Sequence, residues 1–134
     1  MTTSGDGELV LLVGHCVPDS ALIRSGIRRA APDARVERVN DADELRDKLP
    51  GARLVLVNRV LVGEFATESG VELIGSIAQQ SAAGGPVVML VSDQPQAQRQ
   101  AERAGASPGF GKSAVHAPET TRLLADVLAP ARKE

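Results

Sequence analysis

The sequence contains no tryptophan and no tyrosine, and its only phenylalanines are Phe65 and Phe110. Proteins that bind single-stranded nucleic acid without sequence preference stack the bases on aromatic side chains. This chain has too few aromatic residues to build such a surface. Its 15 lysines and arginines are scattered among 17 acidic residues, for a net charge of −2. Since no basic patch supplies electrostatic attraction either, we expect no nucleic-acid partner.

Cysteine is just as scarce, with Cys16 the only one in the chain. A single thiol cannot close an internal disulfide, which fits a reducing compartment. The first residues, "MTTSGDGE", have neither the basic segment nor the apolar run of a secretory signal. No apolar stretch approaches the roughly 20 residues that a membrane-spanning helix needs. We therefore expect a soluble, cytoplasmic protein with no membrane partner.

Two kinds of apolar segment alternate along the chain. Short continuous runs such as "ELVLLV", "ARLVLVN" and "PVVMLVS" are typical of strands covered on both faces. Between these runs, apolar residues recur at helical spacing. Strands are predicted at residues 8–13, 34–39, 52–58, 86–92 and around Phe110. Helices are predicted within residues 18–30, 40–49, 71–85, 94–105 and 118–129.

Polar residues at the predicted helix starts indicate caps. Asp19 or Ser20 is the expected N-cap of the first helix, and Asp93 that of the fourth. Asp41 and Glu44 have the spacing of a capping box at the start of the second helix. These carboxylates therefore have a structural interpretation before any functional one.

The alternation of five strands with five helices predicts one doubly wound α/β domain with a parallel sheet. We expect this single domain to span residues 1–134, with an ordered core at about 8–129. Ligands of such sheets gather at the carboxyl ends of the strands. The segments expected at that edge are Gly14-His15-Cys16, Asn58-Arg59, Ser92-Asp93 and Lys112-Ser113.

Four segments, in this order and spacing, resemble the receiver domain of bacterial two-component response regulators. "ARLVLVN" and "GVELIGSI" are similar to a receiver's third strand and third helix, and "GPVVMLVS" to its fourth strand. The most specific segment, "AERAGASPGFGKS", is similar to the end of the fourth helix, the fifth strand and its terminal lysine. The resemblance implies a flavodoxin-like, five-stranded sheet of strand order 2-1-3-4-5 with five helices.

The chemistry of the receiver site is altered in this chain. A receiver phosphorylates an aspartate with a magnesium ion held by two acidic residues after the first strand. Here Gly14 and His15, or His15 and Cys16, stand in place of those acids, and Asn58 stands in place of the aspartate. An amide has no anionic oxygen for nucleophilic attack. Magnesium also loses the oxygen ligands that it prefers.

Two further positions complete the altered pocket. Ser92 provides the hydroxyl of the receiver site in one alignment of the fourth strand, whereas Val91 takes that place in another. Lys112 matches the receiver lysine. It is expected to pair with Asp19 or Asp93 or to point to water, and Asn58 is expected to hydrogen-bond loop backbones and Lys112. The degenerate phosphorylation pocket consists of Gly14, His15, Cys16, Asn58, Ser92 and Lys112.

These departures predict a pseudo-receiver: a non-catalytic signalling module without cofactor, acting through protein contacts. The loop after Asn58, with "LVGEF", is expected to form a lid or a contact surface. The family's usual face for partners and dimerisation combines the fourth helix, fifth strand and fifth helix. That face would present Gln98, Arg99, Glu102, Arg103, His116, Glu119 and Arg122.

The alternative is a small-ligand or transition-metal sensing domain that uses the altered pocket. Imidazole and thiolate ligands suit zinc or copper, and His15, Cys16 and His116 are the candidate ligands, with Asp19 as a fourth. Adjacent strand residues point to opposite sides, so His15 and Cys16 would share a metal only if the chain turned after Gly14. An enzymatic site is not predicted, because no nucleophile, base and oxyanion donor can be assembled.

Overall fold

The computed structural model describes residues 7–80 and 85–129. The strands are β1 (Leu9–Val13), β2 (Arg35–Val39), β3 (Ala52–Asn58), β4 (Val87–Val91) and β5 (Ser107–Phe110). The helices are α1 (Val17–Ala30), α2 (Ala42–Lys48), α3 (Gly70–Gln80), α4 (Pro95–Ala104) and α5 (Pro118–Leu128), with single 3₁₀ turns η1 (Leu49–Gly51) and η2 (Lys112–Ala114). The predicted alternation is confirmed. The third helix's predicted end near 82–85 and the predicted fraying beyond residue 129 fall outside the described residues.

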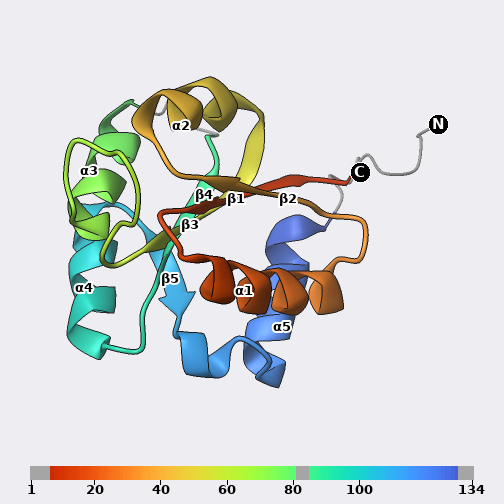
Figure 1. Ribbon diagram of the computed structural model, residues 1–134. Coiled ribbons are helices and arrows are strands. Elements are labelled where there is room, and N and C mark those ends of the chain that lie inside the picture. The colour runs from red at the N-terminus through yellow and green to blue at the C-terminus, as the bar shows by residue number, and fades with distance from the viewer. Residues whose placement is uncertain (1–6, 81–84, 130–134) are drawn as a thin grey trace.

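The five strands form one parallel sheet in the order β2-β1-β3-β4-β5. This order is the predicted one. Helices α1 and α5 cover one face, and α2, α3 and α4 cover the other (Figure 1). Within the described residues, no helix is both long and apolar enough to span a membrane.

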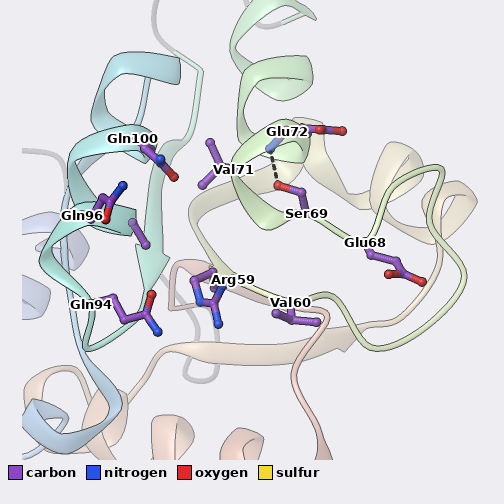
Figure 2. A pocket seen from close by; sticks show the side chains of 10 residues that line it. Arg59, Val60, Glu68, Ser69, Val71, Glu72, Gln94, Gln96 and Gln100 are labelled. Atoms are coloured by element: carbon purple, nitrogen blue, oxygen red, sulfur yellow. Dashed lines mark hydrogen bonds between the residues drawn. The ribbon is translucent and has the colours of Figure 1, made fainter.

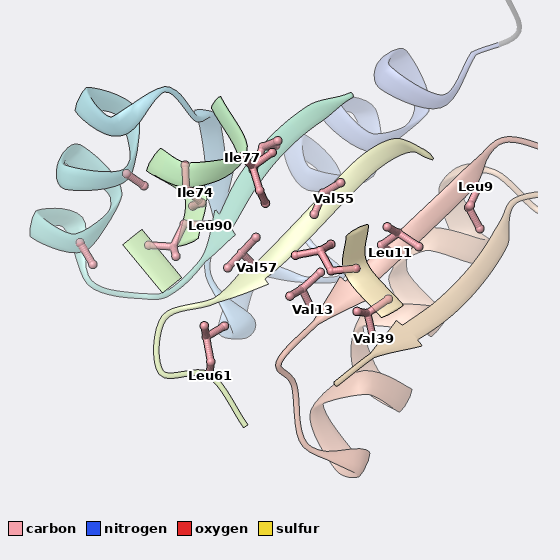
Figure 3. Close-up of a cluster of buried hydrophobic side chains, with 14 residues drawn as sticks. Leu9, Leu11, Val13, Val39, Val55, Val57, Leu61, Ile74, Ile77 and Leu90 are labelled. Carbon is pink, nitrogen blue, oxygen red and sulfur yellow. The ribbon is translucent and has the colours of Figure 1, made fainter. Parts of the chain in front are cut away.

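Each central strand is buried on both faces because its side chains alternate between two aliphatic clusters. Leu11 and Val57 lie in the cluster under α2, α3 and α4 (Figure 3), whereas Leu12 and Leu56 lie in the cluster under α1 and α5. All four side chains are completely buried. The continuous apolar runs of the sequence therefore reflect helices on both sides of the sheet.

The predicted cap of α2 is confirmed. Asp41 Oδ1 accepts a hydrogen bond from the Glu44 backbone N–H at 2.7 Å. Glu44 completes a variant of the capping box, because its carboxylate accepts from the N–H of Asn40 at 3.3 Å and not from that of Asp41. The chain direction at the carboxyl end of β2 is therefore fixed by side-chain hydrogen bonds.

The predicted caps of α1 and α4 are wrong. Helix α1 begins at Val17 with Cys16 in the N-cap position, so Asp19 and Ser20 lie inside its first turn. Pro18 explains the early start, because its fixed φ suits the first helical turn. Gln94 occupies the N-cap of α4. The two aspartates expected there are engaged elsewhere, at the carboxyl edge of the sheet.

Candidate functional site

The chain turns sharply where β1 ends. Gly14 has φ 76°, a left-handed conformation that glycine adopts at little cost. Its carbonyl oxygen accepts hydrogen bonds from the Asn58 side chain at 3.0 Å and from the Val62 N–H at 2.9 Å. Gly14 thereby joins β1 to the end of β3 and to the loop that follows it.

Asn58, which the resemblance to receiver domains places in the phosphoacceptor position, is only 8% exposed, and both polar atoms of its amide are hydrogen-bonded. Nδ2 donates to the Gly14 carbonyl at 3.0 Å and to the Val60 carbonyl at 2.7 Å. Oδ1 accepts from the Arg59 N–H at 3.1 Å. The expected bonds to loop backbones are present, but the expected bond to Lys112 is not, because Lys112 donates to Asp19 instead. A carboxylate here would set an anionic oxygen against two carbonyl oxygens, because ionised aspartate is only an acceptor.

The loop at residues 59–69 covers the ends of β1 and β2. Leu61 is buried, and a Cβ added to Gly14 would lie 2.6 Å from Leu61 Cδ2. The Glu64 N–H donates to the Asn40 carbonyl at 2.7 Å, and the Ala42 N–H donates to the Glu64 carbonyl at 3.0 Å. The loop therefore packs as a closed lid. Leu61 is the first residue of "LVGEF", the segment expected to form a lid or a contact surface, but its burial against Gly14 was not predicted.

His15 is completely buried behind the end of β1. Its Nε2 lies 2.9 Å from the Leu56 carbonyl, while its Nδ1 has no hydrogen-bond partner among the described residues. Burial, the largest effect, lowers the pKa of His15 to about 4, with smaller contributions from Lys112 and Arg38. At neutral pH the ring is therefore an uncharged packing group and not a cationic binding group.

Lys112 forms an ion pair with Asp19, with Nζ and Oδ2 2.6 Å apart. The Lys112 hydrogen bond is the main reason why the pKa of Asp19 lies below its usual value, and a hydrogen bond from Cys16 adds to it. Asp19 is one of the two carboxylates that were expected to pair with Lys112. The other, Asp93, accepts instead from the N–H and hydroxyl of Ser113, at 3.2 and 2.8 Å.

Val91 and Ser92 differ in their position relative to Asn58. Val91 is the residue paired with Asn58 across β3 and β4, so an aliphatic side chain stands level with Asn58. Ser92 lies one residue beyond. Its Oγ accepts from the Gln94 N–H at 3.1 Å, at the start of α4. The hydroxyl of Ser92 is thus used in a local turn.

The metal site of the alternative hypothesis is not assembled. His116 Nε2 lies 2.7 Å from the Ser25 hydroxyl on the exposed side of α1, whereas the His15 ring is buried against β3. Across residues 7–80 and 85–129, no three His, Cys, Asp or Glu side chains are grouped closely enough to hold a metal ion. Grouping His15, Cys16 and His116 was wrong, because the 3₁₀ turn η2 carries the chain toward α1 before His116.

Six of the seven residues named for the predicted contact face on α4, β5 and α5 are exposed. The exposed residues are Arg99, Glu102, Arg103, His116, Glu119 and Arg122. Gln98 is not available for contacts, because its Nε2 donates to the carbonyls of Leu90, Ser92 and Phe110 at 2.9, 3.0 and 3.3 Å. It ties α4 to the ends of β4 and β5.

No family model and no curated protein matches this chain. Solved structures do. The receiver domain of the DNA-binding response regulator merR from Colwellia psychrerythraea 34H has a TM-score of 0.71 at 14% identity, over 93% of this chain and 100% of that one. A receiver domain from Rhodospirillum rubrum has a TM-score of 0.58 at 15% identity, over 89% of both chains.

A third solved structure is also similar to this chain. It is a response regulator from Burkholderia pseudomallei with a phosphorylated aspartic acid, calcium ion and citrate. Its TM-score is 0.55 at 18% identity, over 90% of this chain and 72% of that one. At such low identities the likeness concerns the backbone alone. Together with the strand order, these likenesses show that the chain has the flavodoxin-like fold of response-regulator receiver domains.

Proposed function

We propose that this protein is a pseudo-receiver: a signalling module that acts through protein contacts and is not phosphorylated in the ordinary way. The observation that carries the proposal is the hydrogen bonding of Asn58. Its Nδ2 donates to Gly14 and Val60, which holds the lid closed over the end of β1. The residue in the acceptor position thus lacks a nucleophilic oxygen and also supports the local fold.

The cation-binding half of a receiver site is absent as well. The Burkholderia response regulator holds a calcium ion and a phosphorylated aspartic acid. Hard cations require oxygen ligands. In this chain the residues after β1 are Gly14, His15 and Cys16, which supply an uncharged backbone, a buried imidazole and a thiol. Asp19, a carboxylate in the first turn of α1, is paired with Lys112.

A module without phosphotransfer must transmit its state through a surface. The exposed residues of α4, β5 and α5 carry charges of both signs, such as Arg99, Glu102 and Glu119. A mixed-charge surface of this kind suits a polar interface with a protein partner or a second copy of the chain. We place this activity in the cytoplasm, in keeping with the single thiol.

The proposal is tested by incubating the purified protein with acetyl phosphate and Mg²⁺ and measuring its intact mass. A phosphorylatable receiver domain is treated in parallel as the positive control. The expected result is no added phosphoryl group on this chain while the control is modified. A phosphoryl adduct that maps to Asn58 or to a neighbouring lid residue would disprove the proposal.

Asn58→Asp provides the second arm of the experiment. We expect this variant to remain unmodified under the same conditions, because Gly14, His15 and Cys16 still offer no carboxylate for the metal ion. If Asn58→Asp alone is efficiently phosphorylated with Mg²⁺, the loss of cation binding is not part of the mechanism. The pseudo-receiver would then differ from an active receiver by a single side chain.

A further inference from the structure

A hollow on the described surface lies between the first turns of α3 and α4. It has a volume of about 650 Å³, within the range of about 300–1,000 Å³ typical of ligand sites. Figure 2 shows Gln94, Gln96 and Gln100 on the α4 side, Val71 and Ser69 on the α3 side, and Arg59 between them. We refer to this hollow as the α3–α4 groove.

The glutamines of α4 fall into two groups. Gln98 faces the sheet, and its Nε2 donates to three backbone carbonyls, while its buried Oε1 has no partner among the described residues. Gln94, Gln96 and Gln100 line the groove, and none of their side chains has a hydrogen-bond partner within the described part of the chain. A primary amide donates and accepts, as does a peptide unit. The α4 wall therefore offers hydrogen bonds suited to an extended peptide main chain.

The charged and apolar residues that line the groove indicate which side chains such a peptide would carry. Arg59 is exposed and forms no ion pair with any described residue, so it is available to a carboxylate. Val71 and Ala97 supply apolar lining for an aliphatic side chain, and Val60, 52% exposed, extends it. Glu68 and Glu72 also line the groove, but in Figure 2 both carboxylates point away from Arg59 and α4. Glu72 accepts a hydrogen bond from the Thr67 hydroxyl at 2.9 Å.

We propose that the α3–α4 groove binds an extended segment of a partner protein that carries an acidic residue next to an aliphatic one. This proposal rests on the proposed function, since it names the chemistry of a partner for the same non-catalytic module. It places that partner on a surface different from the face formed by α4, β5 and α5.

The experiment selects heptapeptides from a random display library on the purified protein. One enriched sequence is then synthesised and titrated by calorimetry and by ¹H–¹⁵N NMR. The proposal expects enriched sequences with an acidic residue beside an aliphatic one, and chemical-shift changes centred on Arg59, Val71 and Gln96. No enrichment, enriched sequences without an acidic residue, or shifts on the α4–β5–α5 face would each overturn it.

Two charge-reversal variants make the titration specific. Arg59→Glu is expected to weaken binding at least about tenfold, because a like charge replaces the partner of the acidic residue. Arg99→Glu is the matched control on exposed α4 surface outside the groove, and it is expected to change affinity less than about twofold. Equal effects of the two variants would show that the attraction is not local to the groove.

Free N-acetyl-aspartate is the final probe. If it binds as tightly as the peptide, the groove is a small-anion site and the peptide proposal is wrong. None of these outcomes depends on phosphorylation at Asn58, so failure of the groove and failure of the pseudo-receiver proposal are distinguishable. If the protein gains a phosphoryl group and still selects acidic peptides, the pseudo-receiver proposal is wrong and the groove proposal stands.

Discussion

Asn58 and Arg59 are neighbours in the sequence, yet they belong to two regions of opposite character. Asn58 lies in the closed pocket, where its amide makes three hydrogen bonds to the protein and is 8% exposed. Arg59 lines the α3–α4 groove beside three glutamines whose amides are free of partners within the described residues. The difference shows that the residue type alone does not decide whether an amide has a structural role or is available to a ligand. What decides it is whether the amide already has hydrogen-bond partners within the protein.

The largest loss of stability is expected when a charged side chain is placed at Leu56, in the buried strand β3 beneath the closed pocket. Leu56 is completely buried, and its carbonyl receives His15. Leu56→Asp buries an unpaired charge at a cost of several kcal/mol, comparable with the roughly 5–15 kcal/mol stability of a domain. We expect loss of cooperative unfolding in a urea titration followed by circular dichroism. Val60→Asp, at the open groove, is the control and should unfold within about 1 kcal/mol of the parent.

The second prediction concerns the loss of stability at acidic pH. It tests whether the His15 ring is shielded from water in solution, as its complete burial indicates. The folded protein keeps the pKa of His15 at about 4, below the ordinary 6.5. The unfolded chain therefore binds the extra proton first, and stability falls as the pH drops. The free energy of unfolding should decrease by about 3 kcal/mol in total, mostly between pH 6.5 and 4.

Urea titrations at a series of pH values measure this dependence. His116→Gln is the control, because it removes the exposed histidine and should leave the decrease intact. His15→Gln should remove the decrease between pH 6.5 and 4. If the parent protein is equally stable at pH 7 and pH 5, the His15 ring is more accessible to water than its complete burial implies.

The smallest loss of stability is expected when a side-chain amide is replaced by a carboxylate, and this change can be compared in the two regions. Asn58→Asp replaces two donated hydrogen bonds with repulsion from the carbonyls of Gly14 and Val60. It should cost about 2 kcal/mol, typical of a buried polar group left without its partner. Gln96→Glu makes the same change in the open groove and should alter stability by less than about 0.5 kcal/mol. Equal losses in the two variants would mean that the two regions do not differ as described.

Much of the fold could be predicted from periodicity alone. Continuous apolar runs occur where both faces of a strand are covered, and helical spacing occurs where one face is. The helix starts were harder to place, because several polar residues near the start of α1 could serve as the cap. Pro18 and the pairing of Asp19 with Lys112, 93 positions apart in the chain, decided the outcome.

The site was predicted in part. The strand-end rule placed Gly14, Asn58 and Lys112 at one edge before any contact was known. The sequence could not indicate that Leu61 would fill the space above Gly14. It also misplaced His116, which the turn at η2 carries to Ser25 on α1. These outcomes depend on how loops pack, and no local periodicity records that packing.

The sequence by itself determined which side chains are present: an amide at Asn58, no carboxylate among Gly14, His15 and Cys16, and no aromatic residue besides Phe65 and Phe110. Those statements depend only on which side chains exist. The tertiary structure alone decided how each polar group is used. Asn58 and Gln96 carry the same functional group. Folding brings the carbonyl of Gly14, at the end of β1, and that of Val60, in the lid, to Asn58, whereas Gln96 faces the open groove. The physical reason is that hydrogen-bond partners and burial depend on the distances between segments that only folding brings together.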